Sequence, residues 1–85
     1  MQETFYLHQL CAGDRATVLE LNNRPAMRRR LRDLGLIEGT VVECVGKAPW
    51  GDPAAYLIRG AVVAIRTADS RNVCVQIRQN TGGSV

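Results

Sequence analysis

The sequence predicts a mainly β protein, a small five-stranded barrel with one helix inserted after the first strand. Short stretches rich in valine, isoleucine and other apolar residues recur along the chain, separated by glycine, proline and asparagine. Only one segment places its apolar residues at helical spacing. The chain has 85 residues, which is enough for one modest core and therefore for one domain.

Five segments carry the strand signal, and they are Arg15–Leu21, Thr40–Gly46, Ala55–Arg59, Ala61–Arg66 and Val73–Arg78. A sheet this small leaves exposed edges unless it closes, so a closed SH3-like barrel is the economical arrangement. The first strand has apolar residues on both faces, and we expect both faces to be covered. We place the single domain at residues 1–79 and expect the Gly- and Ser-rich residues 80–85 to form a disordered tail.

The helix is predicted in the basic segment that follows Asn23, its expected cap. Met27, Leu31 and Leu34 recur at i, i+4 and i+7, which places them on one face. Gly35 follows directly, where a left-handed residue commonly ends a helix. Later in the chain, the polar residues 67–72 are compatible with a single helical turn.

The predicted helix also carries most of the positive charge. Residues 24–33 contain five arginines and one acid, Asp33, a net charge of +4 against +3 for the whole chain. On a helical wheel Arg28, Arg29 and Arg32 point to solvent, and we predict that they contact a partner. The alternative is a merely solvated face, partly neutralised by Asp33. Arg30 borders the apolar face, and we expect it to brace the fold through a backbone carbonyl or a carboxylate.

The loop after the second predicted strand carries the only tryptophan of the chain, Trp50, among proline, glycine and aspartate. Tryptophan is enriched at the centre of binding surfaces. We therefore include Trp50 and Asp52 in the predicted partner-binding surface. The alternative is that the indole folds back as a lid over one end of the barrel.

The sequence offers no catalytic arrangement. Gly46-Lys47 lacks the first glycine and the hydroxyl residue of a phosphate-binding loop, because Val41 and Ala48 occupy those two positions. The single histidine, His8, has no serine near it in the sequence that could serve as a nucleophile. We therefore expect a binding module and not an enzyme.

His8 and Cys11 have the H-x-x-C spacing of half a zinc site, but the second pair of ligands is missing. We expect that no cofactor is required and that His8 and Cys11 bind zinc or ferrous iron only opportunistically. The alternative is an exposed histidine beside a small turn residue.

The three cysteines do not form a disulfide framework, and the chain has neither a signal peptide nor the ~20-residue apolar run that spans a bilayer. A cytoplasmic protein is expected.

The segment from Arg28 to Val42, RRRLRDLGLIEGTVV, resembles the signature of the FeoA family, the small cytosolic component of bacterial ferrous iron transport. The likeness spans about residues 6–77 and continues through Ala48–Pro53, Gly60, Val63–Arg66 and Val73–Val75. Within this pattern we expect structural roles for Arg30, Leu31, Leu34, Gly35, Leu36 and Gly39.

The resemblance implies an SH3-like barrel that acts as a non-enzymatic accessory of ferrous iron uptake. It implies binding to the cytoplasmic part of the FeoB permease, supporting or regulating transport, with membrane association through that permease and no direct insertion. We expect a monomer or a weak homodimer. Two alternatives stay open, a nucleic-acid-binding small barrel and a transition-metal carrier. Nucleic acid is the less favoured partner, because four aromatic residues provide no stacking platform beside the basic helix.

Overall fold

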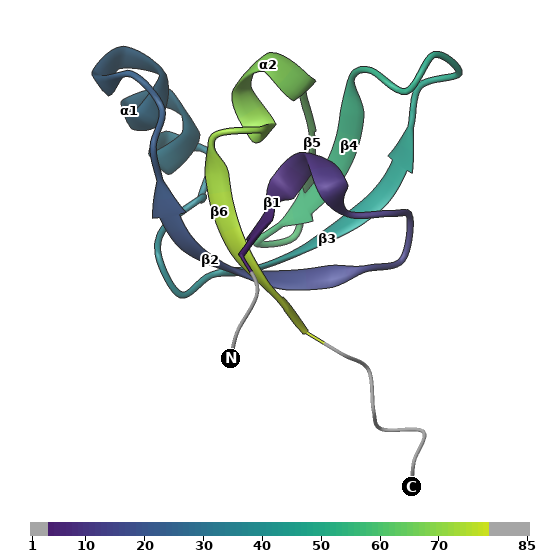
Figure 1. Ribbon diagram of the computed structural model, residues 1–85, viewed down its shortest axis with the longest axis horizontal. Coiled ribbons are helices and arrows are strands. Elements are labelled where there is room, and N and C mark those ends of the chain that lie inside the picture. The colour runs from purple at the N-terminus through teal and green to yellow at the C-terminus, as the bar shows by residue number, and fades with distance from the viewer. Residues whose placement is uncertain (1–3, 79–85) are drawn as a thin grey trace, which may run out of the picture.

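Six strands form one antiparallel sheet in the computed structural model, which describes residues 4–78 (Figure 1). The strands are β1 (Phe5–Tyr6), β2 (Arg15–Leu21), β3 (Val41–Lys47), β4 (Ala54–Ile58), β5 (Ala61–Ile65) and β6 (Val73–Arg78). Their order in the sheet is β1-β6-β2-β3-β4-β5, so β1 and β5 are its end strands. The helical segments are the 3-10 turn η1 (Leu7–Gln9), α1 (Pro25–Asp33) and α2 (Thr67–Ser70). All three lie on the same side of the curved sheet (Figure 1).

The mainly β fold class and the helix after the first long strand are confirmed. Each of the five predicted strands is present, and its ends differ from the prediction by one residue at most. The two-residue strand β1, which pairs with β6, was not predicted, because a segment this short shows no alternation. The predicted tail, residues 80–85, and residue 79 before it lie outside the described residues.

The hydrophobic core contains the inward-facing residues of the long strands. It also contains residues of η1 and α1, and residues of the turns that follow these two helices. Its buried members are Leu7, Leu10, Ala16, Val18, Leu21, Leu31, Leu36, Val42, Cys44, Ala54, Tyr56, Ile58, Ile65, Val73 and Val75. Tyr56 brings a hydroxyl into this core, and that hydroxyl donates a hydrogen bond to the carbonyl oxygen of Leu7 (3.3 Å). Burial raises the pKa of Tyr56 to about 12.

The expectation that both faces of β2 are covered is wrong. Leu19 is 46% exposed, whereas Ala16, Val18 and Leu21 are buried. A bulge between Val18 and Glu20 interrupts the pairing of β2 with β6. The extra residue shifts the alternation, so Leu21 faces the core together with Val18 instead of pointing outward with Leu19.

Gly35 ends α1 as predicted. The N–H of Leu36 donates to the carbonyl oxygen of Leu31 (3.0 Å), and the N–H of Gly35 donates to that of Arg32 (2.9 Å). This pair of bonds is the Schellman motif, which needs a left-handed residue, and Gly35 has φ +108°. The turn delivers Leu36 into the core, where it is fully buried.

Asn23 does not cap α1. The N-cap position belongs to Arg24, and no side chain caps the helix there. Asn23 is instead buried, and its Nδ2 donates to the carbonyl oxygen of Asp69 in α2 (2.9 Å). Asn23 therefore links the β2–α1 connection to α2. This hydrogen bond helps to fix the position of α1 relative to α2 on the same side of the sheet.

Candidate partner-binding site

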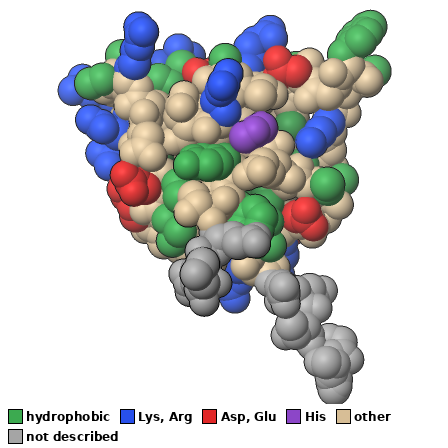
Figure 2. Space-filling model, viewed as in Figure 1, with side chains coloured by type: hydrophobic (Ala, Val, Ile, Leu, Met, Phe, Trp, Pro, Cys, Tyr) green, Lys and Arg blue, Asp and Glu red, His purple; other side chains and the backbone are tan. Residues whose placement is uncertain are grey.

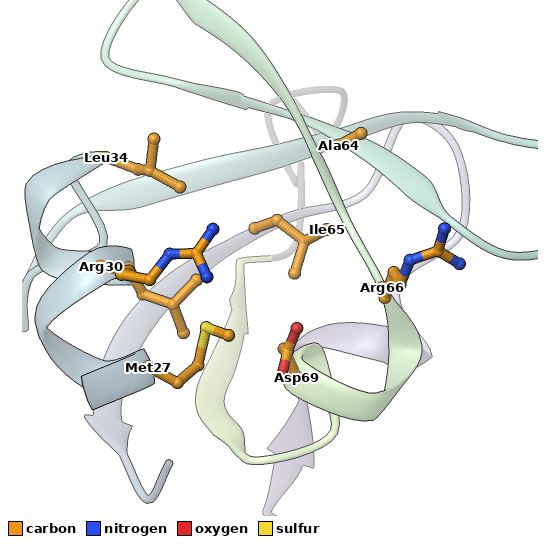
Figure 3. Close-up of a pocket in the computed structure, with 8 residues that line it drawn as sticks. Met27, Arg30, Leu34, Ala64, Ile65, Arg66 and Asp69 are labelled. Carbon is orange, nitrogen blue, oxygen red and sulfur yellow. The ribbon is translucent and has the colours of Figure 1, made fainter. Parts of the chain in front are cut away.

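A hollow of about 330 Å³ lies between α1 on one side and β5 with α2 on the other (Figure 3). Its lining residues are Met27, Arg30, Leu31 and Leu34 from the α1 side and Ala64, Ile65, Arg66 and Asp69 from the β5–α2 side. The hollow exists because only Leu31 of the helix is fully packed into the core. Leu34 was predicted to pack on the same face, but it is 44% exposed, because it stands at the helix end beside the hollow.

The hollow is of mixed polarity, because five of its eight lining residues are apolar and the other three are two arginines and one aspartate. Figure 3 shows the Arg30 side chain reaching from α1 towards Ile65, while the guanidinium of Arg66 points away from the hollow. The expected bracing role of Arg30 is not observed: it is exposed and makes no hydrogen bond or ion pair within residues 4–78. Its guanidinium is therefore available to an acidic group on a partner that fills the hollow.

Two other arginines of α1, Arg32 and Arg28, lie near Glu38. Arg32 forms an ion pair with Glu38 (3.3 Å) in which both side chains are 47% exposed. The backbone N–H of Glu38 itself, followed by Arg32 and Arg28, holds the pKa of that carboxyl below its usual range. An exposed pair of this kind contributes little to stability. The alternative of a solvated face included partial neutralisation by Asp33, but the ion pair that forms within the described residues is Arg32–Glu38.

The predicted partner surface is divided by the fold. Trp50 is 90% exposed in the β3–β4 loop, so it is not a lid over the barrel. In Figure 1 that loop and α1 stand at opposite sides of α2, so Trp50 is separated from Arg28, Arg29 and Arg32. Asp52 has a structural contact, because its Oδ1 accepts a hydrogen bond from the N–H of Thr67 at the start of α2 (2.8 Å).

His8 and Cys11 do not belong to a larger set of metal ligands. Residues 4–78 contain no group of three or more histidine, cysteine, aspartate or glutamate side chains that could hold a metal ion. Burial, and then the charges of Arg71 and Lys47, lower the pKa of His8. The same two positive charges oppose a metal cation at the imidazole. The side chains present therefore do not fit a four-ligand zinc site.

Within the described residues, no helix has the length and apolar composition needed to cross a membrane.

Comparison with known proteins assigns the chain to a family, because residues 5–77 match the FeoA domain. The chain belongs to the FeoA family. A FeoA-containing relative from Porphyromonas gingivalis (strain ATCC BAA-308 / W83), an Fe(2+) transport protein A/Fe(2+) transporter FeoB fusion protein, is 30% identical over 71 residues. The match covers 84% of this chain and 8% of that relative, so the chain spans less than a tenth of its length.

Two solved FeoA structures support the same assignment. The solution structure of FeoA from Chlorobium tepidum is 37% identical, with a TM-score of 0.84 over 88% of this chain and 71% of that chain. The zinc complex of Stenotrophomonas maltophilia FeoA, an SH3 domain protein, is 30% identical, with a TM-score of 0.71 over 85% of this chain and 89% of that chain. The resemblance to FeoA and the SH3-like fold class are thus confirmed, and the family is associated with ferrous iron transport.

Proposed function

We propose that this FeoA-family protein is a non-enzymatic accessory of ferrous iron uptake that binds the cytoplasmic side of a FeoB-type permease. In this role it supports or regulates transport and meets the membrane through the permease. The observation that carries the proposal is the Porphyromonas gingivalis relative, in which a FeoA-like segment and a FeoB transporter form one chain. Fusion holds two modules at high effective concentration, so separate chains that do the same work need a contact surface.

The hollow between α1 and β5 is the surface that suits this contact. Apolar lining residues such as Leu34 and Ile65 can contact one apolar side chain, and Arg30 at the rim suits a neighbouring carboxylate on the same partner segment. The eight lining side chains include no nucleophile paired with a base, which supports a binding role over catalysis. We therefore assign the hollow to an acidic, apolar segment of the cytoplasmic part of the permease.

Binding between the purified 85-residue protein and the cytoplasmic part of the permease, measured by isothermal titration calorimetry, tests the proposal. Leu34→Asp places a charge in the hollow, and Leu19→Asp is a matched control, because the two leucines are 44% and 46% exposed. Full burial of a leucine contributes about 1.5–3 kcal/mol, so the loss from half-exposed Leu34 is about 1 kcal/mol before the carboxylate is desolvated. Leu34→Asp should therefore weaken binding at least about tenfold, since 1.4 kcal/mol is a factor of ten.

Arg30→Glu should weaken the same complex and make the residual binding less sensitive to salt, because its guanidinium pairs with the carboxylate of the partner. Wild-type protein that shows no binding to the cytoplasmic part would overturn the proposed function. Binding that survives Leu34→Asp as well as it survives Leu19→Asp would keep the partner but remove the hollow from the interface.

A further inference from the structure

The tip of the β3–β4 loop presents an isolated indole to solvent. Trp50 is 90% exposed, and its neighbours Pro49 and Gly51 are exposed as well. Figure 1 shows this loop projecting beyond the sheet, and Figure 2 shows hydrophobic side chains protruding at the same corner of the molecule. An indole in this position contributes nothing to the core, and its exposure is unfavourable in water.

Basic side chains surround the base of this loop. The contact between Asp52 and the N–H of Thr67 (2.8 Å) fixes the loop beside α2, whose flanking residues Arg66 and Arg71 are both exposed. Lys47, at the end of β3 where the loop begins, is exposed too. Lys47 and Arg71 both lower the pKa of His8, so each of the two charges lies within electrostatic range of that imidazole. Figure 2 shows lysine and arginine side chains along the edge that carries α1, α2 and the loop.

We propose that Trp50, with Lys47, Arg66 and Arg71, docks the protein on the surface of a bilayer that contains anionic phospholipid. Tryptophan favours the interface between lipid and water, because its ring is apolar and its N–H can still reach a polar group. Each basic residue near an anionic membrane surface strengthens binding. The contact is peripheral, since only the loop tip enters the headgroup region.

A lipid surface suits this loop better than a protein pocket does. Trp50 stands alone on a projecting tip, whereas the tryptophans of protein interfaces are ringed by side chains that exclude water around them. Two acids lie in this area, Asp52 and Asp69. The carboxylate of Asp52 accepts a hydrogen bond from the N–H of Thr67 at the start of α2, and Asp69 is itself a residue of α2. Arg66 also lines the hollow, but its guanidinium points away from it, so bilayer contact through Arg66 leaves the hollow open to a second partner.

Trp50 is the only tryptophan, so the intrinsic fluorescence of the 85-residue protein reports on this loop alone. The test compares vesicles of pure phosphatidylcholine with vesicles of phosphatidylcholine and phosphatidylglycerol, using emission spectra and co-sedimentation. We expect a blue shift and co-sedimentation with the anionic vesicles, both weakened as the salt rises towards about 0.15 M. Trp50→Ala should reduce co-sedimentation by at least about tenfold.

The charge requirement has a matched control. Lys47→Ala with Arg71→Ala should reduce the partition coefficient about 25-fold, because each basic residue near the surface is worth about fivefold. The control variant combines Arg15→Ala with Arg78→Ala and removes the same amount of charge. Arg15 and Arg78 are paired across β2 and β6, at the end of β6 that is remote from α2, so their loss should reduce partitioning far less. Equal effects of the two double variants, or equal binding to neutral and anionic vesicles, would overturn the proposal. A third result would also overturn it: vesicles leave the emission spectrum unchanged, and Trp50→Ala weakens the complex with the permease. Trp50 would then contact a protein and not a lipid surface.

Discussion

Replacing Gly35 by alanine should destabilise the fold, even though alanine lowers the conformational entropy of the unfolded chain. Gly35 has φ +108°, and an alanine held there costs about 1–3 kcal/mol of backbone strain. A Cβ at this position would also lie 3.0 Å from Cγ2 of Ile58 and 2.9 Å from Cδ of Arg59. The Arg59 side chain can move aside, but Ile58 is 1% exposed and has no free space. Overpacking of this kind adds about 1–3 kcal/mol.

Gly39→Ala is the matched control for this substitution. Gly39 has φ +95°, but a Cβ there would meet nothing within 4 Å, so it reports backbone strain without overlap. In either variant, the lower conformational entropy of the unfolded chain offsets about 0.4–1 kcal/mol of the lost stability. We therefore expect a loss of about 1 kcal/mol for Gly39→Ala and about 2–4 kcal/mol for Gly35→Ala. For a domain of this size each kcal/mol lowers the melting temperature by about 4–8 °C.

Urea unfolding followed by far-ultraviolet circular dichroism measures both losses. Tryptophan fluorescence is a poor probe here, because the indole is already 90% exposed in the folded protein. Equal losses for the two variants would refute the argument that the approach of the α1–β3 turn to β4 requires a glycine. A loss below about 1 kcal/mol for Gly35→Ala would refute the strain argument as well.

Three further predictions concern single side chains. Tyr56→Phe removes the hydrogen bond to Leu7 and should cost about 0.5–1.5 kcal/mol at neutral pH. It should also remove a loss of stability between pH 10 and about 12, where tyrosine ionises in the unfolded chain but stays neutral in the folded one. Asp52→Ala removes the acceptor for Thr67 and should cost about 0.5–2 kcal/mol, with Asp52→Asn closer to wild type. As the pH falls below 6.5, the unfolded chain takes up a proton on His8 before the folded chain does, so stability should fall, and His8→Gln should reduce that fall.

Thermal unfolding across a pH series checks these three effects. A Tyr56→Phe variant that keeps the alkaline loss would show that another group causes it. Equal destabilisation by Asp52→Ala and Asp52→Asn would remove the oxygen acceptor from the explanation. An unchanged acid dependence in His8→Gln would mean that the low pKa of His8 is not coupled to folding.

The strands and the helix end could be predicted from the sequence because their signals are local. Alternation marks Val73–Arg78, and the glycine at position 35 marks the Schellman turn. The bulge in β2 could not be predicted, because it depends on the pairing partner, and so Leu19 was assigned to a covered face. Asn23 was assigned to a cap, although its partner Asp69 lies 46 residues away in the sequence.

The candidate site was only half predictable. A helical wheel identifies Leu34 and Arg30 on or beside the apolar face, but it does not show what lies opposite that face. The opposite wall includes Ala64 and Asp69, which the fold places across the hollow from α1. The number of arginines in α1 does not show where each one points, and Arg32 pairs with Glu38. The separation of Trp50 from α1 depends on the position of α2, which the sequence does not indicate.

One wall of the hollow, β5, is also an end strand of the sheet, and its sequence AVVAI carries no charge. Val62 on this strand is 64% exposed. Natural edge strands usually carry charge, proline or a covering segment that prevents pairing with other chains. This strand therefore has little protection against pairing with the edge strand of a second copy of the chain. Colloidal stability should depend on whether another molecule covers β5.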